Sequence, residues 1–197
     1  MFRNYSPLPF VTLPQGTSYA QPTQITPDRV QLDSPAIDVM TDLAHVAAVI
    51  VLASDSIDEA HRRMLQRHVR LLLVVDQERK VMGVISSVDI AGERPVQVAV
   101  ERGIRHDEVL VRNVMIPRRN LQVLNLEEVR TAKVGHIVAT LRLAGRQHIL
   151  VIDRSVMGDV QLRGIFSATQ IFRQLDMPFQ PDILANTFAE IEAQLMH

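Results

Sequence analysis

The chain has 197 residues, of which 47% are hydrophobic, so it is long enough to bury one core or two small cores that share an interface. Its 21 basic and 22 acidic residues leave a net charge of -1, which gives no general reason to expect a nucleic acid as partner. The absence of cysteine excludes disulfides, thiolate metal sites and cysteine nucleophiles. We therefore expect a globular protein.

Residues 1–32 carry five prolines among Gln, Thr and Ser, a composition that resists both helices and central strands. We interpret this segment as an extended arm, although the same composition also fits a disordered tail. Prolines near the start interrupt any apolar core of a secretory signal. The apolar run 44–53 is far shorter than the roughly 20 residues that cross a bilayer. We expect a cytoplasmic protein without a membrane partner.

After the arm, three sequence segments occur twice in the same order. IDVMTD (37–42) matches RNVMIP (112–117), RHVRLLLVVD (67–76) matches AGRQHILVID (144–153), and VMGVISSVDI (81–90) matches LRGIFSATQI (162–171). Three ordered matches predict a duplicated fold.

Hydrophobic periodicity predicts the same elements in both copies. The first copy has a short buried strand at 49–52, a helix at 56–68, strands at 71–75 and 81–86, and a helix that opens at Ser86. The second copy has strands at 121–124, 149–152 and 162–166, a helix whose buried face carries Val134, Ile137 and Leu141, and a helix from Ser167. Each half is therefore β-α-β-β-α.

Because a half of roughly 60 residues is marginal as an independent core, we expect the two copies to pack across their sheets as one pseudo-two-fold α/β (α+β) module. The C-terminal stripe of Leu184, Phe188, Ile191 and Leu195 predicts an amphipathic helix that docks on this module or on a second subunit. The expected units are an arm at 1–32, a first repeat at 33–95, a linking helix at 96–106, a second repeat at 107–176 and a tail helix at 177–197.

Two strand-to-helix junctions have the spacing of helix caps. Ser86 and Asp89 fit an N-cap with an acidic residue in the first turn, and Ser167 and Gln170 fit a capping box. Capping alone explains both pairs. The glycine that precedes each junction indicates a bulge or close backbone packing more than a ligand contact.

The order DVMT, helix, hhVVD, short turn, hGhhSxxD resembles the cystathionine beta-synthase (CBS) domain, and two copies in one chain resemble a Bateman module. The resemblance covers about 33–176. It implies a regulatory sensor of an adenosine-containing ligand, namely AMP, ADP, ATP, S-adenosylmethionine or NAD, that binds in a cleft between the repeats without a required cofactor. It also implies a homodimer that signals to an unidentified effector protein.

The resemblance implies roles for individual residues. Backbone and apolar groups around the DVMT segment hold the adenine, Asp89 holds the ribose, and Ser86 lies near phosphate. Basic and polar side chains before the hhVVD strand touch phosphate, and the equivalent residues of the second copy form its own site. The candidate ligand-binding residues are Val39, Met40, Thr41, Val69, Arg70, Ser86, Asp89, Arg118, Arg119, Gln147, His148, Ser167 and Gln170.

General chemistry supports these roles. A carboxylate accepts hydrogen bonds from ribose hydroxyls, and arginine offers bidentate donors to phosphate. Alternatives remain open, because Arg70 also fits a surface position and His148 also fits a capped strand start. The replacement of Asp by Gln in the second copy predicts that the Asp89 site is the better nucleotide site.

The sequence contains no hydrolase triad order, no HExxH, no GxGxxG and no Walker motif, so we predict no enzyme activity. His61 and His68 lack a third ligand, which argues against a metal site. The alternative function is a scaffold protein that dimerises and recruits a partner through its arm or tail helix without any ligand. Binding of nucleic acid through RHVR or IPRRN is not expected at balanced charge.

Overall fold

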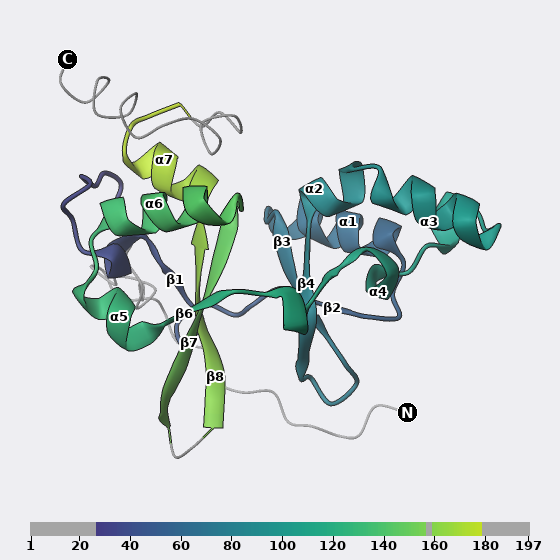
Figure 1. Ribbon diagram of the computed structural model, residues 1–197, viewed down its shortest axis with the longest axis horizontal. Helices are drawn as coiled ribbons and strands as arrows, with labels where there is room; N and C mark the ends of the chain where they lie inside the picture. The colour runs from purple at the N-terminus through teal and green to yellow at the C-terminus, as the bar shows by residue number, and fades with distance from the viewer. Residues whose placement is uncertain (1–26, 157–158, 179–197) are drawn as a thin grey trace, which may run out of the picture.

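The computed structural model describes residues 27–156 and 159–178, which form two four-stranded sheets covered by helices (Figure 1). One sheet has the strand order β2-β3-β4-β5 and the other has the order β1-β8-β7-β6. In each sheet a parallel pair is followed by an antiparallel hairpin. The predicted α/β fold with a repeated β-α-β-β-α order is confirmed.

The first half contributes a sheet with its helices on one face. Its elements are β2 (Ile50–Leu52), α1 (Ile57–Arg67), β3 (Leu71–Val75), β4 (Val81–Ser86), α2 (Ser87–Ala91), α3 (Arg94–Arg102), η2 (His106–Glu108), α4 (Val111–Val114) and β5 (Ile116–Pro117).

The second half repeats this plan with a longer hairpin. Its elements are η1 (Ala36–Val39), β1 (Thr41–Asp42), η3 (Arg118–Asn120), β6 (Val123–Asn125), α5 (Leu126–Thr131), α6 (Val134–Ala144), β7 (His148–Val156), β8 (Asp159–Ser167) and α7 (Ala168–Gln174).

The helices α1 and α6 occupy equivalent places because their apolar spacing and their ends agree. The Ser56 hydroxyl accepts a hydrogen bond from the Glu59 N–H at 3.2 Å and caps α1. Both helices end in a left-handed residue, His68 with φ 52° and Gly145 with φ 58°. The predicted buried face of α6 is confirmed, and α1 buries Ile57, Ala60 and Met64 at the equivalent positions.

Two short strands cross between the halves. Thr41 of β1 pairs with Ile165 of β8, and Ile116 of β5 pairs with Val84 of β4. The IDVMTD segment, which the sequence groups with the first repeat, therefore lies on the second sheet, where Val39 and Met40 are buried in the core. Each sequence repeat thus begins on the sheet of the other.

This crossing explains the two strand glycines. A Cβ on Gly83 would overlap the carbonyl oxygen of Ile116, and a Cβ on Gly164 would overlap the side chain of Met40. Both glycines therefore permit the close approach of the crossing segment, in agreement with the packing interpretation.

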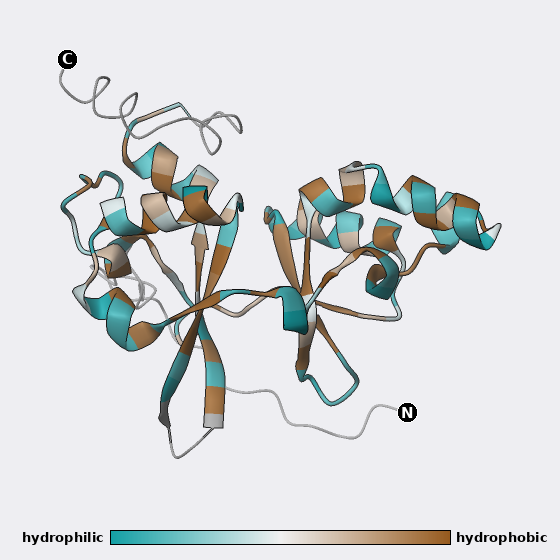
Figure 2. Ribbon diagram, viewed as in Figure 1, coloured by the Kyte–Doolittle hydropathy of each residue, from teal (hydrophilic) through white to brown (hydrophobic). Residues whose placement is uncertain are grey.

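The two sheets share an apolar interface. Leu73 and Val84 from the first sheet and Leu150 from the second are buried together and are surrounded by partly buried apolar side chains from both halves. Figure 2 shows apolar residues along the strands of both sheets and an alternation of polar and apolar residues on the helices. The expected packing of the halves across their sheets is confirmed.

The end of the arm lies on the second half. The Val30 N–H donates to the carbonyl oxygen of Gln174 at 2.8 Å, and the Gln174 side-chain amide donates to the carbonyl oxygen of Pro27 at 2.6 Å. The rest of the arm and the predicted tail helix lie outside the described residues. None of the helices in 27–156 and 159–178 is long and apolar enough to span a membrane.

Candidate functional site

Two cavities lie where the halves meet. The first, here called the Asp89 cavity, has a volume of about 460 Å³. It is lined by Leu71, Val84, Ser86, Val88, Asp89, Ile116, Leu121, Gln122, Gly145, Arg146, Gln147, His148 and Leu150. The second, here called the Arg70 cavity, has a volume of about 310 Å³. It is lined by Thr41, His68, Val69, Arg70, Leu71, His148, Ile165, Ser167, Thr169, Gln170 and Arg173.

Each cavity combines a strand-to-helix junction of one half with a strand start of the other. In the Asp89 cavity, the junction of β4 and α2 faces Gln147 and His148 at the start of β7. In the Arg70 cavity, the junction of β8 and α7 faces Arg70 and Leu71 at the start of β3. The duplicated fold therefore produces two related cavities with different side chains.

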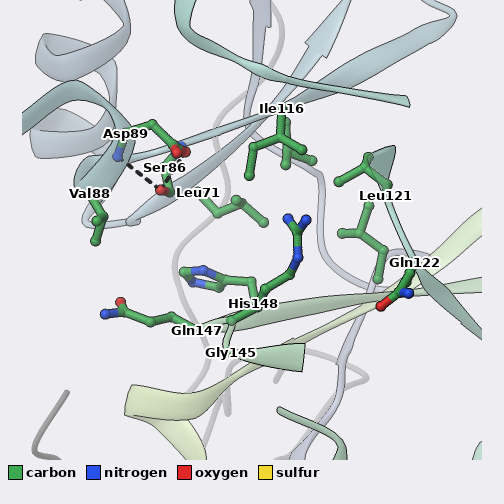
Figure 3. Close-up of a pocket in the computed structure, with 13 residues that line it drawn as sticks. Leu71, Ser86, Val88, Asp89, Ile116, Leu121, Gln122, Gly145, Gln147 and His148 are labelled. Atoms are coloured by element: carbon green, nitrogen blue, oxygen red, sulfur yellow. Dashed lines mark hydrogen bonds between the residues drawn. The ribbon is translucent and has the colours of Figure 1, made fainter. Parts of the chain in front are cut away.

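Asp89 and Ser86 form a complete capping box at the edge of the larger cavity (Figure 3). The Ser86 N–H and Oγ–H both donate to Oδ2 of Asp89, at 2.8 and 2.6 Å. Among the described residues, no donor contacts Oδ1 of Asp89. The capping interpretation is thus confirmed, and one carboxylate oxygen is still available to a ligand hydroxyl.

The second junction differs from its sequence expectation. Ser167 is the N-cap of α7 but its side chain makes no capping hydrogen bond, so the predicted capping box is wrong. Instead, Oε1 of Gln170 accepts a hydrogen bond from the Thr41 hydroxyl at 3.5 Å. The longer Gln side chain reaches the crossing strand β1, whereas the shorter Asp89 folds back on its own helix.

The charges of the two cavities differ. The Asp89 cavity contains one carboxylate, Asp89, and one guanidinium, Arg146. The Arg70 cavity is lined by Arg70, Arg173 and His68, with no carboxylate among its described lining residues. The sequence led us to expect Asp89, Ser86 and Arg70 in one site, but Arg70 lies in the other cavity. Its counterpart beside Asp89 is Gln147, and Arg146 supplies the nearby cation.

Four other predicted residues line neither cavity. Val39 and Met40 are in the second core, because β1 crosses to that sheet. Arg118 and Arg119 are exposed in η3, which follows the crossing strand β5. The remaining candidates, Thr41, Val69, Gln147, His148, Ser167 and Gln170, line one or both cavities.

Sequence reasoning missed five polar lining residues, namely Gln122 and Arg146 in the Asp89 cavity and His68, Thr169 and Arg173 in the Arg70 cavity. Arg146 directly precedes the predicted Gln147, so the start of the strand carried the necessary signal. Gln122 and Arg173 do not belong to the repeated motifs, and only the tertiary arrangement brings them to the cavities.

Among the described titratable groups, His148 has the most strongly shifted pKa. Burial, and then the positive charge of Arg70, lowers the pKa of His148 to about 4, whereas the negative charge of Asp89 opposes this shift. The imidazole is therefore neutral near pH 7 and offers one N–H donor and one acceptor nitrogen.

Residues 36–95 match the family model of the CBS domain. This segment is therefore similar to a CBS domain. Among solved structures, an uncharacterized conserved protein from Pyrococcus horikoshii is 22% identical, with a TM-score of 0.54 over 77% of this chain and 98% of that chain. A conserved CBS-domain protein from Thermoplasma acidophilum is 20% identical, with a TM-score of 0.50 over 80% of this chain and 75% of that chain. The fold is that of a tandem CBS pair. No curated protein matches the sequence.

Proposed function

We propose that the chain is a regulatory CBS-domain module that binds an adenosine-containing nucleotide in the Asp89 cavity. The observation that carries this proposal is the combination of an apolar wall, an available carboxylate oxygen and a guanidinium around one space between the halves. Its volume of about 460 Å³ is within the range of small-molecule sites, roughly 300 to 1,000 Å³.

The lining suggests a placement for each part of the ligand. Leu71, Ile116 and Leu150 offer apolar surface to a planar base. Oδ1 of Asp89 can accept a hydrogen bond from a ribose hydroxyl, and Arg146 can donate to a phosphate. With one cation and one anion in its lining, this cavity suits a monophosphate better than a triphosphate. The candidate ligands are AMP, ADP, ATP, S-adenosylmethionine and NAD.

The rival function is a scaffold that binds proteins without a ligand. Val88, Val96 and Val100 are exposed on α2 and α3, two helices in contact with each other, and exposed apolar side chains of this kind favour a protein contact. Either function is compatible with the proposed homodimer and effector protein. Sedimentation velocity of the purified chain tests the dimer, and a single species of monomer mass would refute it.

A thermal-shift panel separates nucleotide sensing from scaffolding. A ligand that binds only the folded chain at about 100 times its dissociation constant adds about 2.7 kcal/mol, which raises the midpoint of a chain of this size by roughly 5 to 10 °C. We expect AMP to produce such a shift and guanosine monophosphate to produce a smaller one. A folded chain whose midpoint moves with none of the five ligands would favour the scaffold.

A further inference from the structure

One polar side chain lines both cavities. His148, the first residue of β7, and Leu71, the first residue of β3, are the residues common to the two linings. They occupy equivalent places in the two halves, since His148 pairs with Ser167 as Leu71 pairs with Ser86. The boundary between the cavities is therefore formed by the apolar side chain of Leu71 and the imidazole of His148. Figure 3 shows His148 facing the space beside Asp89 and Ser86.

Charged groups surround this imidazole on both sides. Asp89 on α2 and Arg146 lie with it in the Asp89 cavity, and Arg70, Arg173 and His68 lie with it in the Arg70 cavity. Arg70 lowers the pKa of His148 and Asp89 raises it, so one charged group of each cavity acts on the same ring. A change of charge in either cavity should therefore change the pKa of His148.

The chemistry of a neutral imidazole limits what it can offer. It has one N–H, and a phosphate oxygen can only accept. Near pH 7 the ring can therefore donate to an anion in one cavity at a time.

We propose that His148 couples the two cavities, so that an anionic group held in the Arg70 cavity weakens binding of a nucleotide phosphate in the Asp89 cavity. This proposal rests on the proposed function for its nucleotide but not for the shared imidazole. The coupling is negative near pH 7. It weakens as pH falls toward about 4, the pKa of His148, because a protonated ring has a second N–H for the second anion.

The first test needs no ligand. The imidazole signals are followed by NMR against pH, and the signal that disappears in His148→Gln is assigned to His148. We expect Arg70→Gln to raise the titration midpoint of His148 and Asp89→Asn to lower it. Arg67→Gln, an exposed change on α1 that lines neither cavity, should leave it unmoved. A midpoint that responds to only one of the two cavity variants overturns the coupling.

The second test uses inorganic phosphate as the anion and AMP as the nucleotide, at constant ionic strength. We expect phosphate to raise the dissociation constant of AMP at pH 7.5 by about fivefold or more, a typical size for coupling between sites. The effect should vanish in Arg70→Gln/Arg173→Gln, which removes the cations of the Arg70 cavity. It should also vanish in His148→Gln, whose amide has two N–H donors. If phosphate still raises the dissociation constant of AMP in either variant, phosphate competes directly with AMP, and the proposal is overturned. Absence of AMP binding refutes the proposed nucleotide instead, and the NMR result then decides the shared imidazole by itself.

Discussion

Replacing Gly83 by alanine is expected to lower the free energy of unfolding by about 3 kcal/mol, the upper part of the range for overpacking. The added Cβ would overlap the carbonyl oxygen of Ile116 on β5, and the neighbouring Cα of Pro117 lies 3.1 Å from it. Because these are backbone atoms, only a movement of the whole crossing strand relieves the contact. Urea unfolding followed by circular dichroism measures the loss.

The equivalent change in the second half is the matched control. A Cβ on Gly164 would meet the side chain of Met40, which can change rotamer, so Gly164→Ala should cost only about 1 kcal/mol. Equal losses for the two variants would contradict the role given to the backbone of β5. A tolerated Gly83→Ala would show that β5 does not need to approach β4 this closely.

Arg163→Met is expected to lower the free energy of unfolding by about 2 kcal/mol at pH 7, because it removes the guanidinium that pairs with two carboxylates. Arg163 on β8 donates to both carboxylate oxygens of Asp42 at 2.7 and 2.8 Å and lies 3.7 Å from Asp153. The Asp42 side chain is only 13% exposed. The first half has Met82 at the matching position, so the variant copies the other repeat.

The loss should depend on pH in a defined direction. The hydrogen bond from Arg163 lowers the pKa of Asp42 in the folded chain. Its stabilisation is therefore fully present above the unfolded pKa, about 3.9, and disappears as pH falls through the lower folded pKa. The difference between wild type and Arg163→Met should shrink below pH 4. A double-mutant cycle with Asp42→Asn isolates the pair, and a coupling near zero at pH 7 would contradict its importance.

The duplicated fold could be predicted because its main elements carry local signals. The β-branched runs became β3 and β4, and the apolar spacing of Ile57, Ala60 and Met64 became the buried face of α1. The crossing strands β1 and β5 have only two residues each, so no periodicity identifies them. Their placement depends on packing against Gly164 and Gly83, which is a tertiary property.

The residue types of the candidate site could be predicted from the sequence, but their division between two cavities could not. The motif around Asp89 and the strand start at Gln147 and His148 were identified from the repeat, and they do line one cavity. The sequence placed Arg70 beside Asp89, because a motif carried over within one repeat ignores that each cavity uses both halves. The side-chain choice of Gln170, toward Thr41 and away from Ser167, is also set by the crossing strand.

Calorimetric titration of AMP into wild type, Asp89→Ala and Ser56→Ala tests most directly whether a nucleotide binds at the Asp89 cavity. Both variants lose a helix cap and about 1 kcal/mol of stability, but Ser56 caps α1 and lines neither cavity. We predict that Asp89→Ala weakens AMP binding by about 1 to 3 kcal/mol, or roughly 5- to 150-fold, and that Ser56→Ala leaves the affinity unchanged. Equal affinities in all three proteins would show that Asp89 only caps its helix, and the absence of heat from folded wild type would contradict nucleotide binding.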